Sequence, residues 1–465
     1  MKHILTNTLK INSFIIVFIA ILLLTSCDNL VEIDPSSDQI NRQDIFEDIH
    51  TVNAALIELY TSSRQGSFFI GSNLGLGSIL GMYTDELDCY VSQTSNKNIT
   101  DVFDNNILAT NTIVANFWAT SYTNIYKINS FIEGLTNSAN IDESLKNTYL
   151  GEAYFLRALY HQYLFKIYGE VPYITTTKYK ENTRVNKEST NAVLSKIDND
   201  LQLSASLLDY TYRNNLRIFP NKATVELVLA KNNLLQHNYQ QAEIYALKII
   251  QNPLYQLEYN LDMVFKKNAS STLWQFDTHA VGIATQEATY YNFKTVPPKD
   301  VALSNNLIES FEDLDKRKTS WINKITENNK SFYHSFKYKN TENNNDELSI
   351  VFRVEEAYFI IIEALFKQQK IQEAGAYLNI IRERAGLMPI ESYTSTDEFK
   401  KAMLQESRHE FFCEFGHRFF DLKRNNSLDI LQNSKSNWET KHELFPYPEN
   451  ELILNPNLSP QNYGY

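Results

Sequence analysis

Residues 221–251, NKATVELVLAKNNLLQHNYQQAEIYALKIIQ, are the stretch that decides the fold class. Apolar residues recur in this stretch at helical spacing, in two runs separated by the polar pair His237 and Asn238. Pro253 follows the second run, and its ring prevents a helix from continuing. The stretch therefore predicts two helices joined by a tight turn.

A second stretch with the same pattern lies 132 positions later, at residues 353–383. Both copies place a small residue, Ala242 or Ala374, early in the second helix, where it lets the two helices cross closely. The pattern resembles the tetratricopeptide (TPR) repeat, although its usual glycine is replaced by Ala230 and Ile362. The apolar and aromatic residues of the second copy that fall on those of the first are Ile361, Phe366, Ile371, Ala374, Tyr377, Leu378 and Ile381.

Helical periodicity recurs along the rest of the chain. It predicts helices over residues 44–60, 148–168, 189–208, 351–366 and 399–415. Gly169 should end the second of these, Ser189 or Thr190 should cap the third, and Gly416 should end the last. Only thirteen glycines and eleven prolines are present, which leaves few tight turns for a strand-rich fold. We therefore expect a mostly α fold.

Composition and charge exclude two broad classes of protein. The chain has 465 residues, of which 43% are hydrophobic, so it is globular rather than disordered. Its 55 acidic residues outnumber the 43 Lys and Arg residues, which gives a net charge of −12. Because a nucleic-acid binder needs basic residues to contact phosphates, we expect no nucleic-acid partner.

The N-terminus resembles a bacterial lipoprotein signal. Lys2 and Lys10 precede an apolar run at residues 14–24, which is too short for a spanning helix and suits a signal peptide. The run ends in Leu-Thr-Ser-Cys, which resembles a lipobox, so residues 1–26 would be removed and Cys27 acylated, for example with palmitate. Residues 27–37 would then tether the protein to a membrane. An ordinary cleaved signal is the alternative.

Two stretches interrupt the helical pattern. Residues 66–81 hold five of the thirteen glycines, but their spacing does not match a dinucleotide-binding loop, and we expect a backbone that bends or packs closely there. Residues 268–305 form a long aromatic-rich insertion between the helix pairs, and such insertions often carry function. Within it Trp274 and Phe276 alternate like a short buried strand.

Motifs that would carry catalysis are absent. The sequence has no Gly-x-Ser-x-Gly elbow, Walker A loop, His-Glu-x-x-His or Cys-x-x-Cys pair. Asp85, Glu86 and Asp88 suit a Ca²⁺ cluster or a glycosidase pair, but neighbouring carboxylates are common on the surface of an acidic chain. We expect no enzyme activity, no cofactor and no metal. Cys89 and Cys413 should be free thiols.

Eight sequence blocks, taken in order, resemble the SusD/RagB family of nutrient-binding lipoproteins from Bacteroidetes. The blocks at residues 150–160 and 416–424 are the most specific part of the resemblance. The blocks are LGEAYFLRALY at 150–160, LFKIYGEVPY at 164–173, NKAT at 221–224, RERAGL at 382–387, ESRHEFF at 406–412, GHRFFDLKR at 416–424, LFPYPENE at 444–451 and NPNL at 455–458.

The resemblance implies a SusD-like fold with TPR-type helix pairs and long irregular ligand-binding loops. Residues 38–215 would form its N-terminal part and residues 216–465 its C-terminal part, together one compact unit. It also implies a lipid-anchored protein on the outer face of the outer membrane that captures oligosaccharide for a SusC-type TonB-dependent receptor. Alternatives are a peptide-binding member of the family or a TPR interaction scaffold, whereas a surface glycoside hydrolase is disfavoured.

Two sets of residues follow from this interpretation. Six arginines in or near the blocks should form partly buried ion pairs with nearby acids and fix helix ends: Arg157, Arg382, Arg384, Arg408, Arg418 and Arg424, with Glu152, Glu383, Glu406, Glu410 and Asp421. Sugar rings need flat aromatic side chains for stacking and polar groups for their hydroxyls. The candidate ligand-binding residues are Tyr90, Tyr290, Tyr291 and Phe293, with Asp85, Asp88 and Asn98 as polar partners.

Overall fold

The computed structural model describes residues 42–66, 68–278 and 280–465. The chain divides into two compact units, residues 1–45 and 46–465. The only element described in the first unit is α2 (Arg42–Ile45). The predicted signal peptide, Cys27 and the tether lie outside the described residues. Within the described residues, no helix has the length and apolarity required to span a membrane.

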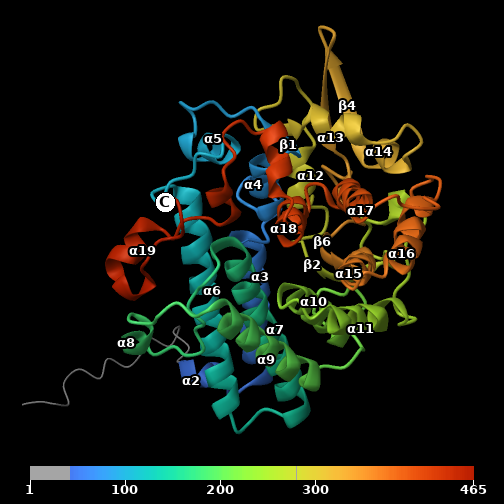
Figure 1. The fold of residues 1–465 in the computed structure, drawn as a ribbon. Coiled ribbons are helices and arrows are strands. Elements are labelled where there is room, and N and C mark those ends of the chain that lie inside the picture. The colour runs from blue at the N-terminus through green and yellow to red at the C-terminus, as the bar shows by residue number, and fades with distance from the viewer. Residues whose placement is uncertain (1–41, 67, 279) are drawn as a thin grey trace, which may run out of the picture. The chain divides into compact units, whose positions relative to one another are not determined.

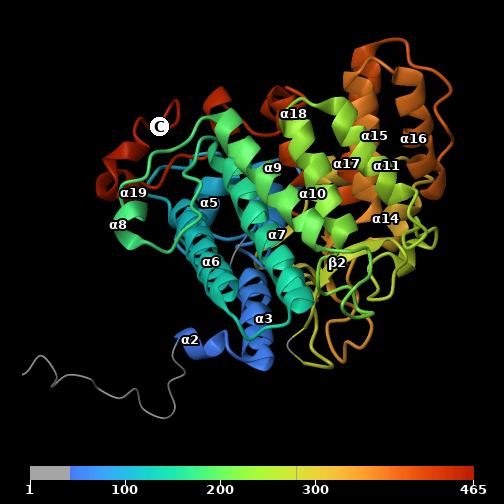
Figure 2. The same cartoon turned by 90° about the horizontal axis from the view of Figure 1, so that it is seen from below.

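Four long helices form the N-terminal half of the second unit (Figures 1 and 2). They are α3 (Ile49–Gly66), α6 (Thr112–Asn137), α7 (Glu143–Tyr168) and α9 (Thr190–Leu207). Helix α7 packs against both α6 and α9, and most of its residues are buried. Gly169 ends α7 with a φ of 78°, as predicted. Ser189 precedes α9 as predicted, but its side chain makes no capping hydrogen bond.

Helix α6 was not predicted from the periodicity. Polar residues interrupt its apolar stripe, and three of them, Ser121, Asn124 and Asn129, are buried. Two of them have side-chain partners. The Ser121 hydroxyl donates to the carbonyl oxygen of Phe117 at 2.6 Å. The Asn129 amide donates to the carbonyl oxygen of Ile174 at 3.0 Å, and its side-chain oxygen accepts from Arg157. A pattern of apolar residues alone cannot reveal a helix whose buried face contains satisfied polar groups.

The two TPR-type helix pairs are confirmed. They are α10 (Lys222–Leu235) with α11 (Tyr239–Ile250), and α15 (Val354–Lys367) with α16 (Ile371–Arg384). Helix α11 packs against α15, so the pairs are stacked although they are far apart in sequence (Figure 1). Ala242 and Ala374 are fully buried at the crossings. The turns within the two helix pairs also match each other, because His237 and Gln369, which are 132 positions apart, both have positive φ.

Several predicted helix boundaries are wrong. The helix predicted over residues 44–60 is interrupted between α2 and α3 and continues to Gly66, and α7 begins at Glu143 rather than at residue 148. Residues 351–353 belong to strand β6 (Ser349–Arg353), which pairs antiparallel with β2 (Thr272–Phe276), so the buried strand around Trp274 is confirmed. The last predicted helix stops early, at the end of α17 (Thr396–Phe411). Cys413, Phe415 and Gly416 then have positive φ, and Gly416 begins α18 (His417–Arg424) rather than ending α17.

A small antiparallel sheet lies at one end of the second unit, beyond α12 and α13 (Figure 1). Its strand order is β1 (Leu87–Cys89), β3 (Val301–Leu303), β5 (Lys330–Ser335) and β4 (Ile322–Glu327). The insertion at residues 268–305 is therefore more regular than expected, because it contains β2, α12 (Gln286–Tyr291) and β3. Helices nevertheless dominate the described residues, so the mostly α prediction is confirmed.

Short elements complete the unit. Among them are α4 (Leu76–Tyr83), α5 (Lys97–Phe103), α14 (Lys316–Ser320) and the 3₁₀ turn η3 (Thr440–Glu443). The others are α8 (Tyr179–Asn182), α13 (Asn305–Ser310), α19 (Glu449–Leu454), η1 (Leu261–Met263), η2 (Leu428–Asn433) and η4 (Pro456–Leu458). The glycine-rich stretch packs closely, as predicted. A Cβ atom on Gly77 would lie 2.4 Å from the carbonyl oxygen of Cys413.

Candidate functional site

Asp85 belongs to the core and not to a ligand surface. Only 7% of the residue is exposed, and both carboxylate oxygens accept hydrogen bonds of 2.9 Å from the Arg418 guanidinium. Arg408 lies 3.3 Å from the same carboxylate and donates to the Asp85 carbonyl oxygen. These partners occupy the carboxylate of Asp85, so the structure places this predicted polar partner for ligand inside the core. Its role is to connect the start of β1 to α17 and α18.

The neighbouring Glu86 is also buried, which argues against a metal or catalytic role for this acidic segment. Burial raises the pKa of Glu86 to about 7, although Arg408 opposes the shift. Within the described residues, no group of three or more His, Cys, Asp or Glu side chains is placed to hold a metal ion. Cys89 and Cys413 are free thiols, as predicted.

Asp88 and Tyr90, at the end of β1, are half-buried and lie at the surface of the small sheet. The Tyr90 amide donates to the Asp300 carbonyl oxygen at 2.8 Å, and the Tyr90 ring packs edge-on against Phe332, with centroids 5.8 Å apart. Burial raises the pKa of Asp88, although Lys435 and Lys330 lower it. This pair therefore places one carboxylate and one aromatic ring beside a strand of the sheet.

Phe293 packs on strand β5, which also carries Phe332. Its ring lies 4.8 Å from the His334 ring. Phe332 and His334 are two residues apart on β5, so their side chains point to the same side of the sheet. Tyr90 and Phe293 come from segments more than 200 positions apart, yet both pack on this side. We call this group the aromatic face, defined as Tyr90, Phe293, Phe332 and His334.

Tyr290 and Tyr291 lie at the end of helix α12 and have different environments. Tyr290 is half-buried, and its hydroxyl lies 2.9 Å from the Ser78 hydroxyl. Tyr291 is 5% exposed and lines a small internal cavity with Gly77 and Cys413. Burial raises the pKa of both tyrosines. The structure therefore places Tyr291, a predicted ligand contact, in the core, because the helix turns its side chain inward.

Asn98 joins two helices. Its side-chain oxygen accepts a hydrogen bond of 3.0 Å from the Thr112 amide, and its carbonyl oxygen accepts one from the Asn111 side chain. These bonds tie α5 to the first turn of α6. Of the hydrogen bonds that Asn98 makes to described residues, none reaches the aromatic face, so the structure does not bring this candidate together with Tyr90 and Phe293.

Three residues of this region were not selected from the sequence: Asp300, Phe332 and His334. The available signal was the segment around Asn328 and Asn329, because two adjacent asparagines with positive φ suit a tight hairpin turn. The six residues after this turn alternate between two sides of a strand, with Phe332 and His334 buried on one of them. Recognising the hairpin would have indicated β5, but not which segments pack on it.

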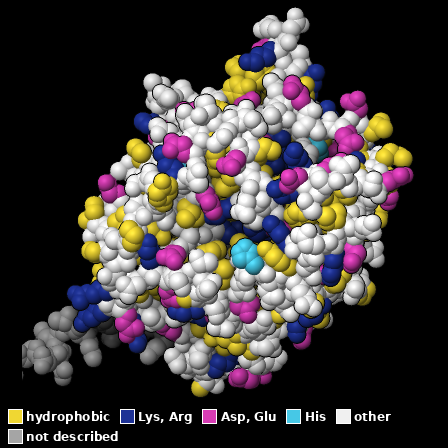
Figure 3. All heavy atoms as spheres, in the orientation of Figure 1, with side chains coloured by type: hydrophobic (Ala, Val, Ile, Leu, Met, Phe, Trp, Pro, Cys, Tyr) yellow, Lys and Arg dark blue, Asp and Glu magenta, His cyan; other side chains and the backbone are white. Residues whose placement is uncertain are grey.

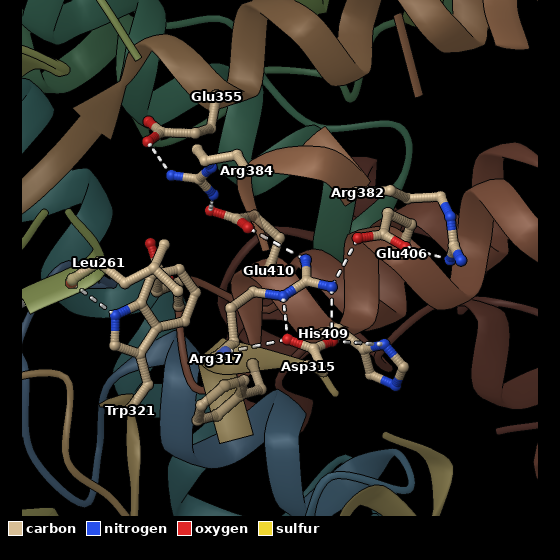
Figure 4. Close-up of polar contacts among 12 residues, drawn as sticks. Leu261, Asp315, Arg317, Trp321, Glu355, Arg382, Arg384, Glu406, His409 and Glu410 are labelled. Carbon is tan, nitrogen blue, oxygen red and sulfur yellow. Dashed lines mark hydrogen bonds and ion pairs between the residues drawn. The ribbon is translucent and has the colours of Figure 1, made fainter. Parts of the chain in front are cut away.

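Two arginines of the sequence blocks, Arg382 and Arg384, belong to a buried ion-pair network around Arg317 (Figure 4). Arg317 is fully buried at its centre; its guanidinium lies 2.7 Å from Asp315, 2.6 Å from Glu406 and 3.2 Å from Glu410. Burial lowers the pKa of Arg317, but Glu406 and Asp315 outweigh this effect and hold it above the usual value. The network also includes Arg353, Glu355, Arg382 and Arg384. It joins α14 to α15, α16 and α17.

The prediction that these arginines are structural is confirmed, but several predicted partners are wrong. Arg157 pairs with Asp200 of α9 at 2.7 Å, whereas Glu152 accepts from Arg213 and Tyr60. Glu383 is exposed and takes no part. Sequence proximity favours neighbours on one helix, but residues five apart, such as Glu152 and Arg157, point in different directions on a helix. Each of these two residues pairs with a residue outside its own helix.

Comparisons with known proteins agree with this fold. A protein-family model described as "Starch-binding associating with outer membrane" matches residues 76–234. SusD-like protein P2 from Formosa agariphila is 27% identical over 76% of this chain and 81% of its own length. Two solved structures also match. A laminarin binding SusD-like protein has a TM-score of 0.74 and 21% identity, with 90% of this chain and all of that chain covered. Surface glycan-binding protein A from Bacteroides uniformis has a TM-score of 0.76 and 19% identity, with 89% of this chain and 99% of that chain covered.

These comparisons confirm the resemblance found in the sequence blocks. The family model and the relative are both similar to this chain in sequence, and the solved structures share its fold.

Proposed function

We propose that this SusD-like chain is a cell-surface protein that binds oligosaccharide and leaves it chemically unchanged. The aromatic face is the observation that carries the proposal. Its rings Tyr90 and Phe293 are half-buried, so they are held in place by Phe332 and His334 and still present area to solvent. A fixed ring can stack on the apolar face of a sugar at low entropic cost, and Asp88 lies beside it to accept hydroxyl hydrogen bonds.

The relatives support a carbohydrate ligand. One of the matching structures is a laminarin binding protein, and another is a surface glycan-binding protein. The matching family model carries the description "Starch-binding". These ligands are the natural first members of a test panel for this chain.

The chemistry of the acidic residues supports binding without hydrolysis. Glycosidases use two carboxyl groups at a defined separation, one on each side of the scissile bond. In the acidic segment before the aromatic face, Asp85 is held by two arginines and Glu86 is buried, so Asp88 alone reaches the surface. Asp88 can accept hydrogen bonds from a sugar, but this segment offers no second accessible carboxylate for the other catalytic role.

Anchoring and partnership complete the proposal. Cys27 is acylated and holds the chain on the outer face of the outer membrane, and the bound oligosaccharide passes to a SusC-type TonB-dependent receptor. The apolar run and lipobox-like residues before Cys27 support the anchor. Cys27→Ala should move the protein from the membrane fraction to the soluble fraction of cells. Retention of the variant in the membrane fraction would contradict the anchor.

The binding function can be tested by calorimetric titration against laminarin, starch oligosaccharides and an oligopeptide of similar size. We expect dissociation constants in a range of roughly 1 μM to 1 mM for one glycan. Tyr90→Ala and Phe293→Ala should each weaken binding about fivefold, because one stacking ring contributes about 1 kcal/mol. Tyr179→Ala is the matched control, since that ring is exposed on α8.

Three outcomes would overturn the proposal. Binding of the oligopeptide without any glycan would assign the chain to peptide capture. Equal affinity of wild type and the Tyr90 and Phe293 variants would place the glycan elsewhere. Release of new reducing ends during the titration would show that the protein is an enzyme.

A further inference from the structure

A second hollow lies away from the aromatic face, where the C-terminal ends of α7, α10, α15 and α18 meet. Its volume is about 380 Å³, at the lower end of the range for small-molecule sites. Phe420 and Leu234 are buried among its lining residues, whereas His237, Asn426 and Glu443 are exposed at its rim. The hollow is therefore open to solvent and deep enough to hold a small molecule.

Three lysines line this hollow: Lys166, Lys367 and Lys423. Lys423 donates to the carbonyl oxygens of Lys166 and Glu443, at 3.1 and 2.9 Å, and Lys367 donates to that of Arg424 at 3.4 Å. An ammonium has three N–H donors, so both lysines keep at least one for a ligand. These bonds to helix ends hold the two ammonium groups in place.

Lys166 has a more unusual environment. Its ammonium lies 4.2 Å from the centre of the Tyr163 ring and 3.7 Å from that of Phe420, and it makes no hydrogen bond or ion pair to any described residue. Burial, Lys231 and Arg424 lower its pKa well below the usual value, although Asp421 and Glu356 oppose this. Lys166 is half-buried. An ammonium partly withdrawn from water without a counter-ion is costly, and an anion in the hollow would reduce that cost.

Asp421 and Glu356 act on Lys166 but are themselves paired, with Arg424 and Lys231. Among the described residues, no acid in the hollow forms an ion pair with Lys166. Glu363 lines the hollow but is paired with Arg424, at 2.7 Å. Glu443 lies at the exposed rim. Lysines and a histidine line the hollow although the chain has a net charge of −12. Figure 3 shows acidic and basic side chains distributed over the face that it draws.

We propose that this hollow is an anion site that binds the carboxylate or sulfate group of a small ligand, in particular an acidic monosaccharide or disaccharide. Lys166 is the central contact, and Lys367 and Lys423 complete it from the rim. The hollow contains none of the four residues of the aromatic face, so this anion site does not depend on the proposed glycan function.

Titration of the full chain, purified in mild detergent at low salt, tests the site with glucuronate, glucose and inorganic sulfate. We expect glucuronate to bind at least tenfold more tightly than glucose. If sulfate binds more weakly than glucuronate, the occupant is an acidic sugar. If sulfate binds as tightly as glucuronate, the occupant is a free oxyanion. Both results support an anion site. Equal binding of glucuronate and glucose, or no binding of either anion, would overturn it.

Three lysine variants locate the binding. Lys166→Met should weaken glucuronate binding at least fivefold and Lys367→Gln about threefold. Lys370→Gln is the matched control, because Lys370 follows the same helix, is exposed and does not line the hollow. Should Lys166→Met fail to fold, Lys367→Gln decides the question. A loss in the control equal to that in Lys367→Gln, or no loss in either lining variant, would contradict the site.

Tyr90→Ala separates the two proposals. It should leave glucuronate affinity unchanged while it weakens binding of the neutral glycan, and Lys367→Gln should do the reverse. Loss of glucuronate binding in Tyr90→Ala would place the acid on the aromatic face and overturn the anion site.

Discussion

The ion-pair network around Arg317 and the aromatic face around Tyr90 are both built from side chains that bind ligands well, yet only one of them is available to a ligand. In the network, charges find their partners inside the chain: Arg317 contacts three carboxylates and is fully buried. In the aromatic face, Tyr90 and Phe293 each pack one side of the ring and remain half-exposed. The comparison shows that residue type alone does not indicate where a ligand can bind. A ligand can bind only where side chains still have exposed area or hydrogen-bonding groups that the fold does not occupy.

The largest expected effect tests the core side of this comparison. Arg317→Met should reduce the free energy of unfolding by about 3–5 kcal/mol, because Asp315, Glu406 and Glu410 would lose a shared buried partner. Denaturant unfolding followed by circular dichroism measures the change. Lys97→Ala is the control, since its ion pair with Asp101 leaves the lysine side chain 68% exposed and should contribute less than about 1 kcal/mol. Equal losses in both variants would contradict a structural role for the network.

Glu86 differs from the paired charges of the network. It is a buried acid, and its Oε1 has no hydrogen-bond partner among the described residues. Burial raises its pKa to about 7, from a usual value of 4.5. As pH rises from 4.5 to 7, the unfolded chain ionises this group first, so the folded state loses stability, on the order of 3 kcal/mol in total above pH 7.

Glu86→Gln should remove this loss. The stability of the variant relative to wild type should therefore increase between pH 5 and pH 8, as measured by urea unfolding at each pH. A difference that stays constant over this range, or that decreases, would show that Glu86 is ionised in the folded protein at pH 5.

The helix crossing at Ala374 should give a smaller effect. Ala374 is fully buried where α16 meets α15, so Ala374→Leu should overpack the interface and destabilise the protein by about 1–3 kcal/mol. Thermal unfolding measures this, with Glu373→Leu as a control at the neighbouring exposed position. An unchanged melting temperature for Ala374→Leu would argue against close packing of the second repeat.

The smallest effect on stability is expected on the aromatic face. Tyr90→Ala should lower the free energy of unfolding by less than about 1 kcal/mol, because its half-exposed ring loses little buried area, even though the same substitution weakens glycan binding about fivefold. Tyr291→Ala provides the contrast, since that ring is buried and its removal should cost about 3–5 kcal/mol. A Tyr90 variant as unstable as the Tyr291 variant would make Tyr90 a core residue.

Much of the fold follows from local pattern. The helix pairs were predictable because helical spacing, a polar turn and a small residue at the crossing are all properties of short segments such as residues 221–251. Helix α6 was not, because its buried polar residues are satisfied by partners such as Arg157 on another helix. The helix boundaries near Phe415 and Gly416 were also not predicted, because the backbone there takes positive φ to fit the surrounding structure.

The candidate site was predictable only in part. The sequence indicated an aromatic insertion and the segment after the glycines, and Tyr90 and Phe293 do lie on one side of the small sheet. It could not distinguish Tyr290 from Tyr291, because adjacent residues of α12 face in different directions. Asp85 was selected as a surface acid, and only its pairing with Arg418, 333 positions away, places it in the core.

The sequence by itself therefore indicated the resemblance to the SusD/RagB family, the mostly α class and the two helix pairs, because these depend on residue order and spacing within short segments. Tertiary structure alone decided which charges cancel, which rings stay exposed and where Lys166 is left without a counter-ion. The physical reason is that burial and ion pairing depend on contacts between distant segments, and the same Asp, Arg or Tyr is structural or available according to what packs against it.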